Sequence, residues 1–205
     1  MRKITTIAVA MFIVSCSSSR TTETDQTPPK PMDVGYVWKF LVSGVKATDT
    51  ATWTVVDTLN FNGRKFYKFQ IEYDTVDKAY WTISGDTILS MNILKFATFE
   101  DTVVVRELLP NVGVGDTYAD TVVIKPDTIT LVYERHVQNI SDIQVPYGNV
   151  SSAYEVLRLE RYIHTGITPD TGIITSRTTY YFKPELFLIK YIDDTLKYEL
   201  LEILK

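Results

Sequence analysis

Closely spaced turn signals divide the chain from Met32 onward into short runs rich in Val, Ile, Thr, Tyr and Phe. Such runs favour strands, and breaks about every 8–12 residues favour an antiparallel sheet over a parallel α/β sheet. The clearest break is Asn62-Gly63, which suits a type I′ turn joining residues 51–59 to residues 65–73. We therefore expect a mainly β, antiparallel fold of about ten strands, either a curved sheet or half-barrel or a β-sandwich.

Two segments fit a helix as well as a strand. Residues 150–162 and 196–204 place Leu and Tyr at helical spacings. One helical face would carry Leu196, Leu200, Leu201 and Leu204. We expect both segments to be strands. One or two helices lying on the sheet remain the alternative.

The N-terminus has the organisation of a secretory signal. Arg2 and Lys3 precede a largely apolar run, residues 4–14, and small Ser15 precedes Cys16, the only cysteine. The run is too short to cross a bilayer, which takes about 20 residues. We therefore expect export.

The four residues Ile13-Val14-Ser15-Cys16 resemble the bacterial lipobox. The resemblance implies that the Cys16 thiol receives a diacylglycerol, that cleavage occurs before Cys16, and that its new amine is acylated with a chain such as palmitate. Two or three acyl chains anchor a protein stably, whereas one holds it only marginally. We expect an outer-membrane lipoprotein whose partner is membrane lipid, with the leaflet left open.

Composition divides the chain into three parts. Residues 1–15 are the expected signal peptide, and residues 16–31 carry the lipid on Cys16 and a polar, proline-rich tether. Residues 32–205 are enough to bury a core as one β-rich domain. The net charge of −4, without a basic cluster, argues against nucleic acid as a partner.

The dipeptide Asp-Thr occurs ten times, and in eight cases an aliphatic residue follows. The structural explanation is that Asp favours turns and Thr favours the first position of a strand. The functional explanation is a resemblance to the acceptor motif of a Gram-negative O-glycosylation system for exported proteins. That resemblance implies glycans on Thr50, Thr58, Thr75, Thr87, Thr102, Thr121, Thr128 and Thr195.

Local catalytic and metal-binding motifs are missing from the sequence. His136 and His164 lie far apart without a metal-ligand spacing, and the pair Asp193-Asp194 sits at an expected turn. We expect no metal, no cofactor and no enzymatic activity. Glycosidase carboxylates need no local motif, so a carbohydrate-active enzyme or a glycan-binding module remains a lesser alternative.

Several longer motifs are similar to those of a loose group of exported β-rich lipoproteins. They are Gly35-Tyr36-Val37-Trp38, Asn62-Gly63-Arg64-Lys65, Gly115-Asp116-Thr117-Tyr118, Val145-Pro146-Tyr147-Gly148 and Tyr180-Tyr181-Phe182-Lys183-Pro184. The resemblance implies a single antiparallel sheet, curved as in the lipoprotein carriers LolA and LolB. It implies nothing about mechanism.

Two functions follow from these features. The first is a non-catalytic structural or interaction component of the envelope, with other envelope proteins as partners. The alternative is a carrier of an apolar ligand, a lipid or a lipoprotein, held in a cavity of the curved sheet. An empty apolar groove of several hundred Å³ would favour the carrier, and a sealed core would favour the structural component.

Overall fold

The computed structural model describes residues 32–44, 48–96, 99–124, 129–164, 173–193 and 195–205. Within these ranges all regular structure is β, in twelve strands and no helix. No helix of the described chain could therefore cross a membrane. The strands are β1 (Val37–Ser43), β2 (Thr48–Phe61), β3 (Arg64–Glu72), β4 (Val76–Ser84), β5 (Thr87–Phe96), β6 (Phe99–Leu108), β7 (Thr117–Ile124), β8 (Ile129–Val145), β9 (Gly148–His164), β10 (Ile173–Lys183), β11 (Phe187–Asp193) and β12 (Leu196–Leu204).

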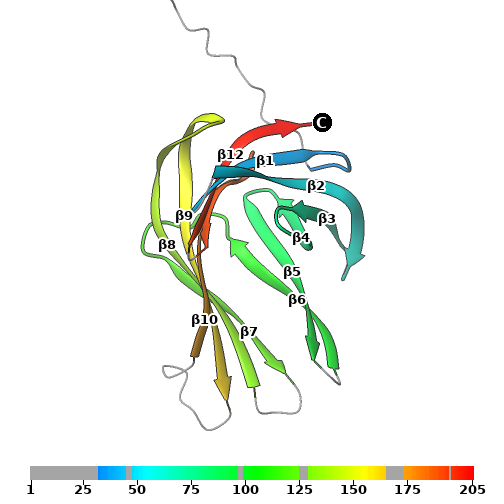
Figure 1. Cartoon of the computed structure of the whole chain (residues 1–205). Helices are drawn as coiled ribbons and strands as arrows, with labels where there is room; N and C mark the ends of the chain where they lie inside the picture. The colour runs from blue at the N-terminus through cyan, green and yellow to red at the C-terminus, as the bar shows by residue number, and fades with distance from the viewer. Residues whose placement is uncertain (1–31, 45–47, 97–98, 125–128, 165–172, 194) are drawn as a thin grey trace, which may run out of the picture.

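All twelve strands belong to one antiparallel sheet. Its order is β6-β5-β4-β3-β2-β1-β12-β11-β10-β9-β8-β7, so two meanders of six strands meet where β1 pairs with β12. The sheet curves strongly, and β5 and β6 stand opposite β7 to β10 in the lower part of Figure 1. The predicted mainly β, antiparallel, curved fold is confirmed. The described chain has two strands more than the ten expected.

The meander depends on tight turns, of which the predicted Asn62-Gly63 turn is the clearest. Both residues have positive φ, 50° and 74°, as a type I′ turn requires. Phe61 pairs with Arg64 across the turn, which fixes the register of β2 on β3. The hairpin prediction is confirmed.

The two segments that also fitted a helix are strands. β9 pairs with both β8 and β10, and β12 pairs with both β1 and β11. In β12 the buried residues Tyr198 and Leu200 alternate with more exposed neighbours, which is the period of a strand. Pairing on both sides selects the strand over the helix.

Aromatic side chains fill the part of the sheet around the β1–β12 junction. The Phe69 ring stacks on Phe187 at 5.5 Å between centroids, and Trp81 meets Phe187 edge-on at 5.2 Å. The Trp38 indole donates a hydrogen bond to the Leu186 carbonyl at 3.1 Å. Their cluster also contains Phe40, Trp53 and Phe182. Ring pairs of this kind add to the stabilisation gained by burial.

Side chains bridge the two edge strands, β6 and β7. Among the described residues no backbone ladder joins these strands. Instead, Asp120 of β7 accepts hydrogen bonds at 2.7 Å from the backbone N–H and from Nε of Arg106 in β6. Arg106 Nη2 donates to the Ala119 carbonyl, and the Tyr118 hydroxyl donates to the Glu107 carbonyl at 2.9 Å. We call this contact the seam, and it nearly closes the sheet.

Candidate ligand-binding cavity

A charged cluster is buried inside the sheet, close to the seam. Glu107 of β6 and Arg135 of β8 are both fully buried, and Arg158 of β9 is 8% exposed. Arg135 Nη2 lies 2.7 Å from Glu107 Oε2, and Arg158 Nη1 lies 3.1 Å from Oε1. The Ser90 hydroxyl donates to Oε1 at 2.5 Å. The Glu107 carboxylate is therefore bonded on both oxygens.

These partners decide the charge of Glu107. Burial by itself raises the pKa of its carboxyl group, because a charged form is poorly solvated in the interior. The positive charges of Arg135 and Arg158, with hydrogen bonds from Arg135 and Ser90, outweigh burial and lower the pKa below its usual value. Glu107 is therefore an ionised acceptor rather than a proton donor.

The cluster carries no net charge when Glu160 is included. Glu160 lies on β9 two residues beyond Arg158 and pairs with its Nη2. Two arginines, Arg135 and Arg158, thus face two carboxylates, Glu107 and Glu160. Both guanidinium groups also lie near the Tyr133 ring, at 5.9 and 5.5 Å from its centroid.

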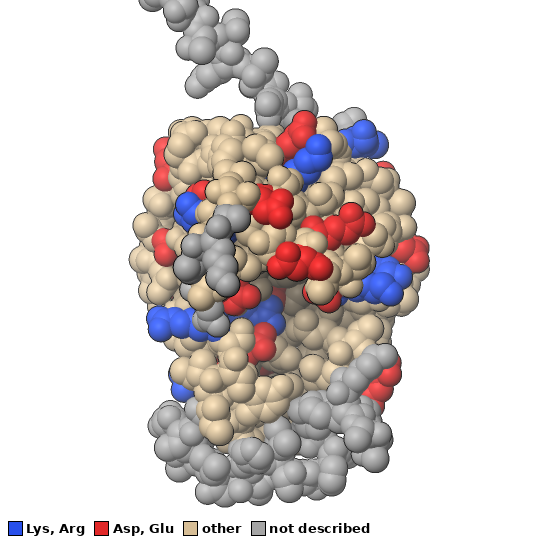
Figure 2. All heavy atoms as spheres, in the orientation of Figure 1, with Lys and Arg blue, Asp and Glu red and all other residues tan. Residues whose placement is uncertain are grey.

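A cavity of about 220 Å³ lies beside this cluster. Figure 2 shows the surface hollowed near the middle of one face, with acidic and basic atoms around the hollow. Most of the cavity wall is aromatic or aliphatic, and it is built from β2, β3, β4, β5, β9, β10 and β11. Its lining residues are Trp53, Ile71, Ala79, Tyr80, Trp81, Ser90, Met91, Asn92, Arg158, Tyr180 and Tyr191.

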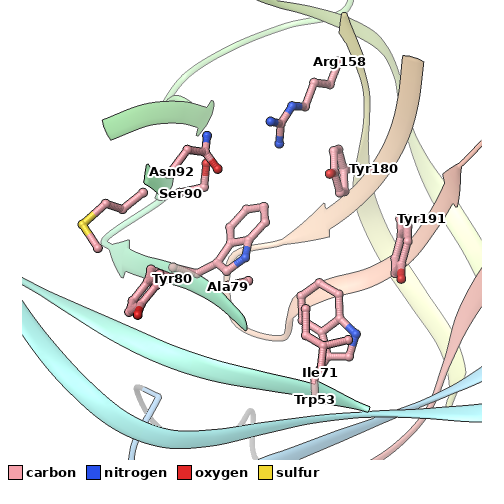
Figure 3. Close-up of a pocket in the computed structure, with 11 residues that line it drawn as sticks. Trp53, Ile71, Ala79, Tyr80, Ser90, Asn92, Arg158, Tyr180 and Tyr191 are labelled. Carbon is pink, nitrogen blue, oxygen red and sulfur yellow. The ribbon is translucent and has the colours of Figure 1, made fainter. Parts of the chain in front are cut away.

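The cavity is polar at one end and apolar at the other. Figure 3 shows the Arg158 guanidinium pointing into the space between Asn92 and Tyr180, with Ser90 beside Asn92. Trp53 and Ile71 lie at the opposite end of the view. A ligand that fits this wall has a polar group at one end of an apolar body.

Three donor groups that belong to lining residues lack a protein partner. Trp53 Nε1, Asn92 Nδ2 and Arg158 Nε are buried and have no hydrogen-bond acceptor among the described residues. An unpaired buried donor costs about 1–3 kcal/mol. These three atoms are enclosed by the protein, so a ligand in the cavity does not reach them in this arrangement.

None of the described residues that the sequence proposed as sites lines this cavity. Cys16 and Thr128 lie outside the described residues. The described threonines of the Asp-Thr-aliphatic set are all at least partly exposed: Thr50, Thr75, Thr121 and Thr195 are exposed, and Thr58, Thr87 and Thr102 are half-buried.

Four of the seven described threonines in the Asp-Thr-aliphatic set depart from the expected turn-to-strand position. Thr87 does begin strand β5 after a turn, as predicted. In contrast, Thr50, Thr58, Thr102 and Thr121 lie within strands. In the first three of these the preceding Asp side chain accepts a hydrogen bond from the Thr backbone N–H at 2.7 Å. Turn chemistry thus explains only some of the repeats, and local side-chain-to-backbone bonding explains others.

The two histidines do not come together as a site. His136 of β8 lies 3.2 Å from the Thr117 hydroxyl and 3.5 Å from Glu134, whereas His164 ends β9. Among the described residues no three His, Cys, Asp or Glu side chains form a metal-binding group. Asp194 lies outside the described residues, so the Asp193-Asp194 pair has no described geometry.

The sequence contained one signal for the charged cluster. In β8 the inward-facing positions are Leu131, Tyr133, Arg135 and Val137, all buried. A charge in an apolar alternation is unusual, because charged groups are rarely buried without partners. Arg135 could have been singled out in this way, but its partner Glu107 could not.

Solved structures supply the remaining comparison, since no family model and no curated protein matches the sequence. A predicted exported protein with a YmcC-like fold from Bacteroides fragilis aligns with a TM-score of 0.50 at 8% identity, over 85% of this chain and 98% of that chain. A predicted lipoprotein from Parabacteroides distasonis gives a TM-score of 0.49 at 11% identity, over 85% and 97%. At this identity the first likeness shows the fold alone. The chain shares its curved, β-rich fold with that exported protein.

Proposed function

We propose that this chain is an exported, lipid-anchored protein that binds a small, largely apolar ligand inside its curved sheet. The observation that carries the proposal is the aromatic-lined cavity of about 220 Å³ with the Arg158 guanidinium at its polar end. Apolar walls with a few placed polar groups are typical of small-molecule sites.

The size of the cavity favours a small ligand over a lipid or a lipoprotein. Drug-sized ligands occupy about 300–1,000 Å³, and an apolar cavity of about 150 Å³ takes up benzene. At about 220 Å³ the cavity suits a molecule slightly larger than benzene. It is smaller than the groove of several hundred Å³ that the carrier of an acyl chain would need.

The lining favours binding over catalysis. None of the described residues that line the cavity is His, Cys, Asp or Glu, the side chains that most often transfer protons or attack substrates. The adjacent Glu107 is bonded to Arg135, Arg158 and Ser90, which keeps it ionised. A glycosidase needs a second free carboxyl group at the same cleft, and the described lining offers none.

Export and anchoring rest on the N-terminal sequence. Arg2, Lys3, the apolar run and Cys16 have the order of a lipoprotein signal. The fold shared with an exported protein supports the same location. We propose the outer membrane as the site of anchoring.

Benzene provides the first test of the cavity. We expect saturating benzene to raise the midpoint of thermal unfolding, because it binds the folded state alone. Ala79→Trp, which fills the cavity from β4, should abolish this rise, whereas Ala119→Trp, at an exposed position of β7, should not. A midpoint that benzene leaves unchanged in the wild-type chain would contradict the proposal.

A structural role in the envelope is the second candidate. The aromatic cluster around Trp38, Phe69 and Phe187 seals most of the interior, as a structural component requires. If benzene does not bind, the structural role is favoured over ligand binding.

A further inference from the structure

We infer that aspartates of the Asp-Thr repeat cap the open edges of the sheet and thereby prevent a second copy of this chain from adding a strand there. These edges are independent of the cavity, so their role goes beyond ligand binding. Three properties support it: which N–H groups the aspartates bind, which way those groups face, and where each strand lacks a neighbour.

Four Asp-Thr pairs lie entirely within described strands, and in all four the Asp carboxylate accepts a hydrogen bond from a backbone N–H. In three pairs the donor is the Thr that follows the Asp, and in the fourth the donor is Arg106 across the seam. These aspartates are Asp49, Asp57 and Asp101, with Asp120 as the fourth, and each bond measures 2.7 Å. Bonds to an ionised acceptor are stronger than those between neutral groups.

The first capped group lies on the outer edge of β6. This strand is the last of the sheet on its side, and β5 is its one ladder partner among the described strands (Figure 1). The Arg106 N–H faces the seam, because it bonds to Asp120 of β7. N–H groups alternate between the two sides of a strand, so the Thr102 N–H, four residues earlier, faces the same open side. Asp101 therefore caps a donor that no neighbouring strand of the described chain satisfies.

The second capped group lies near the start of β2. The Val55 N–H bonds to the Tyr36 carbonyl on the side of β1. Thr50 lies an odd number of residues away in an unbroken register, so its N–H faces the opposite side, toward β3. The ladder of β2 on β3 begins only at Thr52. Asp49 therefore caps an N–H that lies beyond the end of that ladder.

The third capped group lies near the far end of β2. Phe61 pairs with Arg64 across the two-residue turn, so the N–H of Phe61 faces β3. Three residues earlier, the Thr58 N–H faces the side of β1. The ladder of β1 on β2 extends only to Thr54. Asp57 therefore caps an N–H where β2 extends beyond its neighbour.

A second copy of this chain is the partner that such caps exclude. An open row of edge N–H and C=O groups is a template for strand addition, and two identical edges can pair with each other about a twofold axis. The caps occupy the donors that this pairing needs. They also place negative charges on the edge, and a second copy brings the same charges on the same edge.

Sedimentation of the full chain, extracted from membranes in detergent, tests the cap on β6. The wild type should remain monomeric, whereas Asp101→Ala should self-associate at least about tenfold more tightly, the factor expected when one or two N–H bonds form between copies. Hydrogen exchange locates the contact. In Asp101→Ala, exchange at the Thr102 amide should slow as the protein concentration rises, because the added strand covers it.

Three variants separate the cap from a loss of charge. Asp101→Asn keeps an acceptor oxygen and should remain monomeric. Asp77→Ala removes an equal charge from an exposed position of β4, where the carboxylate bonds to the Thr75 hydroxyl, and should also remain monomeric. Asp101→Ala combined with Thr102→Pro has no N–H to offer a second copy, so it should return to the monomer. Proline is tolerated there because the lost N–H faces away from β5.

Three outcomes would overturn the inference. The first is a wild type that already associates and protects the Thr102 amide as its concentration rises. The second is a folded Asp101→Ala that associates no more than the wild type. The third is equal association of Asp101→Ala and Asp77→Ala, which would assign the effect to charge alone. If Asp101→Ala does not fold, Asp49→Ala provides the same comparison at β2, with the Thr50 amide as the readout.

Discussion

The Glu107 carboxylate pairs with both buried arginines, Arg135 and Arg158. Replacing it with the isosteric glutamine leaves Arg135 fully buried without its counter-charge. We expect Glu107→Gln to lower the free energy of unfolding by about 3–5 kcal/mol, measured by urea denaturation. The control is Glu202→Gln, which breaks the exposed pair with Lys39 and should cost less than about 1 kcal/mol. Equal losses in the two variants would contradict this account.

The same carboxylate predicts how stability depends on pH. Its pKa in the folded state lies below the ordinary value of 4.5, because Arg135 and Arg158 outweigh burial. The ionised cluster therefore stabilises the fold fully above about pH 4.5, and that contribution is lost as pH falls through the folded-state pKa. Urea midpoints measured down this range should fall for the wild type and fall less for Glu107→Gln. If the urea midpoints of the two proteins fall equally with pH, other titrating groups cause the loss of stability in acid.

The Asp-Thr-aliphatic threonines can be tested individually. An acceptor hydroxyl must reach a transferase, so Thr50, Thr75, Thr121 and Thr195, which are exposed, should carry O-linked glycans in greater amount than half-buried Thr58 and Thr87. Peptide mass spectrometry of the native exported protein measures the added mass at each site. If all of these peptides are unmodified, the glycosylation hypothesis is wrong. The Asp-Thr repeats are then explained by local hydrogen bonds between the Asp side chain and the Thr backbone N–H, as at Thr50 and Thr58.

At the scale of elements, local chemistry predicted most of the sheet. The β2–β3 hairpin followed from Asn62-Gly63, whose positive φ angles are a property of those two residues. The strand assignment of β12 was less certain, because its leucines also fit a helix. Pairing with β1 and β11, which no local pattern encodes, decides between the two structures.

The cavity could not be predicted in the same way. Its wall draws Trp53 from β2, Asn92 from β5 and Arg158 from β9, and these residues are brought together only by the curvature of the whole sheet. Curvature arises from cumulative twist and from β-bulges, such as the register shift between Val55 and Asp57. The sequence pattern of a single strand does not give the total curvature of the sheet.

The seam between β6 and β7 is the weakest junction of the sheet. Asp120 supplies the acceptor that a neighbouring strand would otherwise give to the Arg106 N–H. Asp120→Ala should therefore speed hydrogen exchange of the β6 amides, Arg106 above all, and leave the β1–β12 junction unchanged. Asp77→Ala, at an exposed aspartate of β4, is the control and should not affect β6. Unchanged exchange at β6 would show that Asp120 does not protect this edge.

At the scale of the whole molecule, the interior contains a packed aromatic cluster and an open cavity. The aromatic cluster surrounds the junction of the first and last strands, where β1 pairs with both β2 and β12. The cavity lies next to the charged cluster, and Trp53 and Trp81 of the aromatic cluster form part of its wall. A sealed core thus supports the site without occupying it, so a ligand can be accommodated without unfolding the junction.

The prediction of membrane anchoring concerns the whole chain, and it depends on Cys16. If its thiol and amine are acylated, the membrane-extracted protein should exceed the mass of residues 16–205 by two or three acyl chains. Cys16→Ala should abolish that addition and leave the precursor uncleaved or the body free of the membrane, because Cys16 is the one cysteine of the sequence. Ser15→Ala keeps a small residue before the cysteine and should be processed normally. Intact-mass spectrometry and membrane fractionation measure both effects, and a wild-type protein that is soluble and begins at another residue would contradict the lipoprotein assignment.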